Sequence, residues 1–164
     1  MAVPRFGYWE ATIEKHGRLK LPSALIKALP EDERKELWIT HGFGKHIMLW
    51  TASAFDAKMK DLDKLNPNEI ASKKYRNAFL RNLTHVDIDA QDRFVIPKPL
   101  LEAYNVVKDV VLVLAKGQIE LWDLAEYNAA FAMSPEEFAE LNQDVEGKIR
   151  NQSNDDLNNL LNSN

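Results

Sequence analysis

The sequence predicts an α+β fold that is built from two copies of one structural unit. The main observation is a repeat: residues 14–22, EKHGRLKLP, return 75 positions later as residues 89–97, DAQDRFVIP. Each copy has an acid first, an arginine four residues later and a proline four residues after that. A strand-like run lies between arginine and proline, and apolar residues at helical spacing follow the proline. A repeat of this length indicates a duplicated unit.

A second pair of similar segments supports the duplication. Residues 47–50, IMLW, correspond to residues 119–122, IELW, at an offset of 72. The second copy is therefore three residues shorter, and the shortening falls in the charged residues 30–36, which are expected to form a surface loop. We expect the equivalent Trp50 and Trp122 to anchor the core rather than to stack on nucleic-acid bases.

The expected elements alternate between strands and helices in the same order in both copies. Gly17 is expected to supply the positive φ of a tight hairpin turn, from which residues 19–21 return alongside the first strand. Residues 66–69, NPNE, are expected to start a helix that runs to about residue 83. Thr51, Asp123 and Ser134 are expected to cap three further helices. The asparagine-rich chain past Arg150 is expected to be frayed. Strands are expected at residues 6–13, 19–21, 37–40, 47–50, 86–88, 94–96, 110–114 and 118–122.

These elements divide the chain into four parts. We expect a first repeat at residues 6–65, a linking helix at 66–83, a second repeat at 84–133, and an acidic helix with an asparagine-rich tail at 134–164. The two repeats can form one domain or two small intertwined ones.

Charge is unevenly distributed along the chain, whose net charge is −4. Residues 1–122 carry 19 Lys and Arg against 16 Asp and Glu, whereas residues 123–164 carry two against nine. The mildly basic body permits an anion-binding face. The sequence lacks cysteine, which excludes disulfides and thiolate metal sites. It also lacks an apolar run of transmembrane length and a secretory signal pattern, so no membrane partner is expected.

Other candidate sites are weak. His41 and His46 flank a glycine-containing loop with no third ligand nearby, so we expect a solvated loop and no metal. Residues 42–45, GFGK, lack the spacing of a phosphate-binding loop. No nucleophile–base pair or carboxylate dyad repeats with the fold, so neither an enzyme, a cofactor nor a small-molecule substrate is expected.

The paired motifs, the two strands that end in tryptophan, and a linking helix with Arg76, Phe79 and Arg81 together resemble the MraZ family. Residues 131–138, FAMSPEEF, are similar to the C-terminal part of members from Bacteroidetes-type bacteria. The resemblance covers residues 6–141. It implies a tandem swapped-hairpin fold of the AbrB kind, a double-split β-barrel with flanking helices. It also implies ring-shaped homo-oligomers.

The function implied by the resemblance is transcription regulation of the bacterial division and cell-wall gene cluster. Such a protein binds tandem repeats in promoter DNA, in the cytoplasm and in association with the nucleoid. The alternative is an antitoxin-like or other protein-interaction module of the AbrB fold, which would hold a partner with its acidic tail.

The arginines of the two motifs carry the implied DNA contact. From the residues alone, Arg18 and Arg93 are expected to form buried ion pairs with Glu14 and Asp89 that fix the hairpins; the resemblance adds base contact, and both roles are compatible. The family usually has Asp at the position of Glu14 and Gly at that of Asp92, and Asp tolerates left-handed backbone. Because repeat two carries two carboxylates, Asp89 and Asp92, beside Arg93, we expect repeat one to contact DNA more strongly. The expected DNA-binding residues are Lys15, His16, Arg18, Lys20, Arg93 and Lys98.

Overall fold

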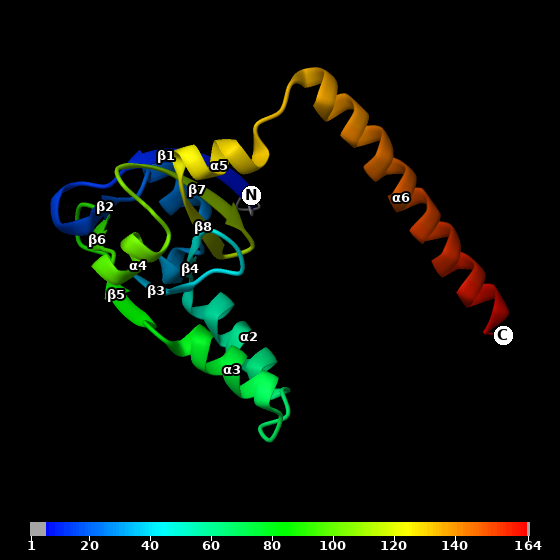
Figure 1. The fold of residues 1–164 in the computed structure, drawn as a ribbon, viewed down its shortest axis with the longest axis horizontal. Coiled ribbons are helices and arrows are strands. Elements are labelled where there is room, and N and C mark those ends of the chain that lie inside the picture. The colour runs from blue at the N-terminus through cyan, green and yellow to red at the C-terminus, as the bar shows by residue number, and fades with distance from the viewer. Residues whose placement is uncertain (1–5, 164) are drawn as a thin grey trace. The chain divides into compact units, whose positions relative to one another are not determined.

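The computed structural model describes residues 6–163, which fall into two compact units. Unit 1 ends at Asn128, and unit 2 begins at Ala129. The described part of unit 1 contains eight strands and confirms a mixed α+β fold (Figure 1). The strands are β1 (Phe6–Thr12), β2 (Arg18–Lys20), β3 (Glu36–His41), β4 (Ile47–Trp50), β5 (Thr84–Asp87), β6 (Arg93–Val95), β7 (Asp109–Ala115) and β8 (Gln118–Asp123).

Helices connect these strands and continue beyond them. Two are single 3₁₀ turns, η1 (Lys15–Gly17) and η2 (Glu31–Glu33). The α-helices are α1 (Ser23–Ala28), α2 (Ala52–Asp63), α3 (Ile70–Leu80), α4 (Lys98–Ala103), α5 (Leu124–Phe131) and α6 (Pro135–Asn162). No helix within residues 6–163 offers a stretch that is both long and apolar enough to cross a membrane.

The strands form two antiparallel sheets. Six of them make one sheet in the order β1-β7-β8-β4-β3-β5, and β2 pairs with β6 in a separate two-stranded sheet. At the centre of the large sheet, Ile47 lies opposite Leu121 and Leu49 opposite Ile119. The repeat offset of 72 residues converts each of these pairs into the other. The order of equivalent strands is therefore the same from either edge of the sheet.

Strands from the two halves of the chain pair with each other. β1 lies along β7, and β5 lies along β3. We expected residues 19–21 to return alongside the first strand; this was wrong, because those segments share only the isolated bridge between Ile13 and Leu19. The edge of β1 is taken by the seven-residue strand β7, in which Val110, Val111, Leu112 and Leu114 are buried, and the three-residue strand β2 pairs with β6 instead.

A single apolar core joins the two halves. It includes Leu19 and Leu21 around β2, Phe94 and Ile96 around β6, and Leu121 on β8, all of which are at most 3% exposed. Burying a side chain of this size stabilises a fold by about 1.5–3 kcal/mol. The core thus holds the two-stranded sheet against the six-stranded one.

Trp50 and Trp122 are buried, as predicted. Trp50 is fully buried, and its Nε1 donates a hydrogen bond of 2.7 Å to Thr40 Oγ1. It packs with Phe55 of α2 and Phe79 of α3 in a second apolar cluster. This cluster attaches the α2–α3 helix pair to the sheet (Figure 1).

The predicted caps have mixed outcomes. Thr51 and Ser134 accept hydrogen bonds from backbone N–H groups three residues later, and Asp123 accepts from two backbone N–H groups of α5, as predicted. The predicted helix start at 66–69 was wrong, because α3 begins only at Ile70. Asn66 Oδ1 instead accepts from the Asn68 N–H at 3.0 Å, a local turn that competes with helix formation.

The C-terminal segment is helical where we expected fraying. α6 continues to Asn162, well past Arg150. Asparagine costs at most about 0.7 kcal/mol per helical position, and each residue added to a nucleated helix gains one backbone hydrogen bond. The start at Ser134 therefore propagates through the polar stretch.

His46 is buried, which corrects the expectation of a solvated loop. Only 6% of its surface is exposed, and neither ring nitrogen has a hydrogen-bond partner. Its ring lies 4.9 Å from that of Trp122, and Nδ1 lies 3.8 Å from a Glu120 carboxylate oxygen. Burial lowers the pKa of His46 below its ordinary value of 6.5, and Glu120 opposes part of this shift.

The lowered pKa of His46 predicts acid sensitivity of the fold. Below pH 6.5 His46 is protonated in the unfolded chain but stays neutral in the folded chain. The free energy of unfolding therefore falls as the pH drops from 6.5 towards the lowered pKa of the folded state. His46→Phe keeps a ring against Trp122 and removes the titrating group. Chemical denaturation across this pH window should show a smaller loss of stability for His46→Phe than for the wild type.

The matched control for this experiment is His16→Ala, because His16 is exposed. This control should lose stability as the wild type does. Equal pH dependence of the wild type and His46→Phe would show that His46 is not the acid-sensitive group.

Candidate nucleic-acid interface

The two repeated motifs form two equivalent turns. We call residues 14–18 turn one and residues 89–93 turn two. In turn one, Arg18 Nε donates to Glu14 Oε2 at 3.1 Å; in turn two, Arg93 Nε donates to Asp89 Oδ2 at the same distance. Both turns are also closed by a backbone hydrogen bond from the N–H of the acid to the carbonyl of the arginine. The expected ion pairs are therefore present in both motifs, but they are not buried: the side chains of Arg18 and Glu14 are each 45% exposed, and those of Arg93 and Asp89 are 30% and 42% exposed.

Left-handed backbone shapes both turns. Gly17 has φ 76°, and its counterpart Asp92 has φ 62°. The predictions of positive φ at Gly17 and of a turn that survives with Asp92 are both confirmed. A Cβ at Gly17 would also lie 2.7 Å from the Ile96 carbonyl oxygen, so glycine is needed there for space as well as for backbone conformation.

The two turns hold their arginines to different degrees. Arg93 donates to Asp89 and, through Nη2, to Gln91 Oε1 at 3.1 Å, and its side chain is 30% exposed. Arg18 has the ion pair to Glu14, and its side chain is 45% exposed. Hydrogen bonds from the backbone N–H groups of Arg93 and Gln91 lower the pKa of Asp89. Turn two thus has more side-chain hydrogen bonds, and Arg18 is the more exposed of the two arginines.

The two-stranded sheet of β2 and β6, which we call the ribbon, joins the turns. The Gly17 carbonyl accepts from the Ile96 N–H at 2.9 Å, and the Asp92 carbonyl accepts from the Leu21 N–H at 2.8 Å. The repeat offset of 75 residues converts each of these two hydrogen bonds into the other. Each turn is therefore fixed to the strand that leaves the other turn.

One face of the ribbon is basic and open to solvent. Leu19 and Phe94 are buried beneath it. Because side chains alternate along a strand, the opposite face carries Arg18 opposite Val95 and Lys20 opposite Arg93. Arg18 and Arg93 are diagonal neighbours on this face, a relation that places them about 7–8 Å apart.

Two like charges face each other on this surface. Lys20 is directly opposite Arg93, and like charges at opposed strand positions destabilise a sheet. Lys20 has no acidic partner among residues 6–163, whereas Arg93 has Asp89. The face therefore has excess positive charge that an anion would neutralise.

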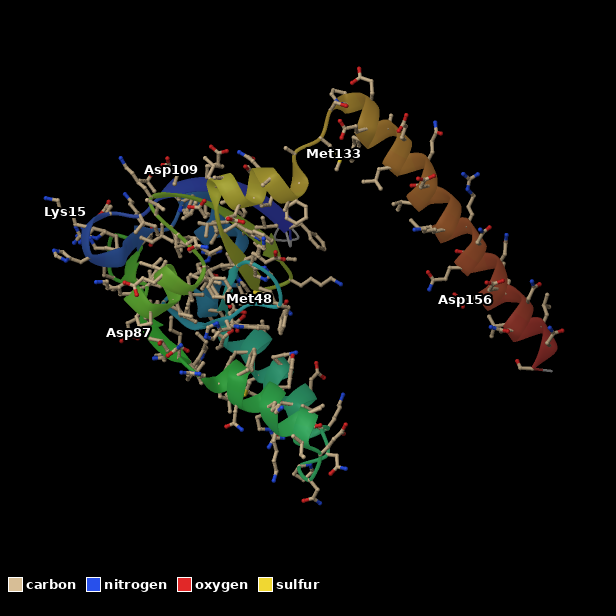
Figure 2. The ribbon with its side chains drawn as sticks, in the orientation of Figure 1. Lys15, Met48, Asp87, Asp109, Met133 and Asp156 are labelled. Atoms are coloured by element: carbon tan, nitrogen blue, oxygen red, sulfur yellow. The ribbon has the colours of Figure 1, made fainter. Side chains whose placement is uncertain are left out.

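The remaining predicted residues lie around this face. Lys15 and His16 are exposed at the tip of turn one, and Figure 2 shows the Lys15 side chain pointing away from the strands. Lys98 opens α4 and pairs with Glu102 at 3.7 Å. The structure thus gathers Arg18, Lys20 and Arg93 on one face.

Two further residues of the site, Val95 and Gln91, were not predicted from the sequence. Val95 is 52% exposed and completes the basic face, and Gln91 holds the Arg93 guanidinium. Alternation along β6 could have identified Val95 as outward, since its neighbours Phe94 and Ile96 are large apolar residues.

Comparison with known proteins decides the family. The chain is 30% identical over 144 residues to "Transcriptional regulator MraZ" of Flavobacterium psychrophilum, which covers 87% of this chain and 92% of that protein. The chain belongs to the MraZ family. A family model described as "MraZ protein, putative antitoxin-like" also matches residues 79–146.

Other members of the MraZ family give the same result. The protein of this name from Christiangramia forsetii is 31% identical over 146 residues, which cover 86% of this chain and 92% of that protein. That from Cytophaga hutchinsonii is 26% identical over 135 residues, which cover 82% and 89% of the two chains. The resemblance read from the paired motifs is confirmed.

The opposed charges on the ribbon predict that Lys20→Gln stabilises the isolated protein. Removing the repulsion from Arg93 should raise the free energy of unfolding by about 0.2–1 kcal/mol at low salt. Salt screens the repulsion, so the gain should shrink as ionic strength rises. Denaturant titrations at low and high salt measure both effects.

Lys98→Gln is the matched control, because Lys98 is exposed and paired with Glu102 rather than opposed by a cation. It should give no gain. A loss of stability in Lys20→Gln at low salt would contradict the inferred repulsion.

Proposed function

We propose that this protein is a sequence-specific DNA-binding transcription regulator whose ribbon enters the major groove of double-stranded DNA. The observation that carries the proposal is the excess positive charge on the open face of β2 and β6. A two-stranded ribbon fits the major groove, and an arginine can form two hydrogen bonds with guanine. The names of the relatives as transcriptional regulators support the same function.

Arg18 is the proposed base-reading residue. Glu14 holds its guanidinium through Nε, which leaves the terminal nitrogens for a base edge. Arg93 is the second candidate, with more of its donors already engaged by Asp89 and Gln91. Base pairs rise about 3.4 Å along the duplex, so the diagonal separation of the arginines matches about two steps.

The other cations have a proposed role in affinity. Lys20 lies on the ribbon face, Lys15 and His16 lie at the tip of turn one, and Lys98 begins α4, the helix that follows β6. Contacts from such residues to phosphates fix the protein on the duplex without reading its sequence. Glu14 and Asp89 brace the arginines.

The proposed architecture is a tandem pair of AbrB-like swapped hairpins. The reciprocal pairing of β1 with β7 and of β5 with β3 supports it. In this scheme, residues 6–65 and 84–133 are the two repeats, residues 66–83 link them, and residues 134–164 form an acidic extension. We further propose a ring-shaped homo-oligomer that binds tandem promoter repeats of the division and cell-wall gene cluster, in the cytoplasm at the nucleoid.

A protein-interaction role is the second candidate. The description of the matching family model as antitoxin-like favours it, together with the exposed acidic helix α6. A gel-shift assay with the DNA upstream of the protein's own gene separates the two roles, because an interaction module would not shift that DNA.

Arg18→Ala should weaken binding to that DNA by about 1–3 kcal/mol per engaged site and should relax sequence preference. Lys20→Ala should weaken binding to all sequences alike and should reduce the slope of log affinity against log salt by about 1 per engaged site. Fluorescence anisotropy with the upstream DNA and a scrambled duplex measures both.

Lys27→Ala is the control, since Lys27 is exposed on α1, outside the ribbon and both turns. It should bind as the wild type does. If Arg18→Ala keeps both affinity and sequence preference, Arg18 does not read bases.

A ring should make binding depend on the number of DNA repeats. Phosphate contacts alone correspond to dissociation constants of about 10⁻⁴–10⁻⁶ M, whereas linked sites can add about 10²–10⁴ in affinity. Affinity for duplexes with one, two and three repeats should therefore rise steeply. Inserting about five base pairs between repeats, roughly half a helical turn, should abolish the gain. Equal affinity for one repeat and three, at an oligomeric protein concentration, would exclude the ring as the source of specificity.

A further inference from the structure

Three side chains with metal-binding chemistry meet on the outer strands of the large sheet. Glu36 begins β3, and His85 and Asp87 lie on β5, the strand at the edge of the sheet. The register pairs Glu36 with Asp87 and Trp38 with His85, so all four side chains project from the same face. Figure 2 labels Asp87 on this strand. Because 49 positions separate Glu36 from His85, no sequence motif marks the group.

The three ligand atoms are already close. His85 Nε2 lies 2.9 Å from Glu36 Oε2, and one oxygen of Asp87 lies within 4.8 Å of both. Ligand atoms that share one tetrahedral zinc ion, at about 2.0–2.2 Å each, are roughly 3.3–3.5 Å apart. Small side-chain rotations therefore suffice to bring all three atoms onto one ion.

The histidine is held in position from beneath. Its ring lies 4.6 Å from that of Trp38, and Trp38 stacks on Phe55 of α2 at 4.6 Å with nearly parallel planes. Trp38 is only partly exposed, and Phe55 is buried. The support limits the orientations of the His85 ring, which lowers the cost of ordering it around an ion.

Charge also favours a cation at this place. Glu36 and Asp87 are directly opposed carboxylates, an arrangement that destabilises an antiparallel pair. His85 bonds to Glu36, and within residues 6–163 no group donates to the Asp87 carboxylate. A divalent ion would neutralise both acids at once.

We propose that Glu36, His85 and Asp87 bind a divalent first-row transition-metal ion of the zinc type. One imidazole and two carboxylates form a donor set that zinc accepts, and three protein ligands leave one position for water. The ion would tie the edge strand β5 to β3. Because β5 runs directly into turn two, the ion would also fix the segment that carries Asp89 and Arg93.

Isothermal titration of the full chain, first stripped with a chelator, with zinc chloride tests the proposal. We expect one ion per chain. Asp87→Asn and His85→Ala should each weaken zinc binding more than about 100-fold, since losing even an outer partner of a ligand costs about 10–100-fold. Cobalt(II), added in place of zinc, should give visible absorption bands of a low-coordinate site in the wild type and not in the variants.

His16→Ala is the control, because His16 is an exposed histidine outside the group. It should bind zinc as the wild type does. Asp87→Asn preserves the size of the side chain, and a melting curve of the metal-free variant verifies its fold. Absence of zinc binding at micromolar protein, or the same affinity in Asp87→Asn as in the wild type, would overturn the proposal.

Discussion

The pairing of β2 with β6 is the interaction on which the rest of unit 1 depends. Its buried side presents Leu19 and Phe94 to the common core, and its open side presents the cations. Its ends are fixed by the reciprocal hydrogen bonds of Gly17 with Ile96 and Asp92 with Leu21. Each turn is closed by its own backbone hydrogen bond and ion pair, but neither β2 nor β6 forms a sheet without the other, so the ribbon requires motifs that lie 75 positions apart in the sequence.

The basic face exists at some expense of stability. A stability-optimised sheet would place an acid opposite Arg93, whereas this one places Lys20 there. Such a local conflict is expected where a surface serves binding rather than folding. The core beneath supplies the compensation, because Leu19 is fully buried and Phe94 is 3% exposed.

Local features of the fold could be predicted from the sequence, and long-range pairing could not. Local residue patterns predicted all eight strands, the positive φ of Gly17, and the burial of Trp50, because each depends on nearby residues or on side-chain size. The pairing of strands from different halves depends on how all the apolar strands compete for partners, and the residues of a single strand do not determine which partner it takes.

The candidate site shows the same division. The ion pairs of both turns lie four residues apart and could be read directly. Lys20 opposite Arg93 required the register of the ribbon. The burial of His46 was not predicted because its loop is polar and contains glycine, whereas the ring packs near Trp122, which lies far along the chain.

The two halves share one covalent chain, and this has an evolutionary consequence. Two separate copies of a single repeat would carry identical turns, so every substitution would act on both. Within one chain, Asp92 can replace the glycine of one turn while Gly17 remains in the other. The two arginines accordingly differ, since Arg93 is held by two side chains and Arg18 by one. The basic face is therefore not symmetric, and its two ends can make different contacts.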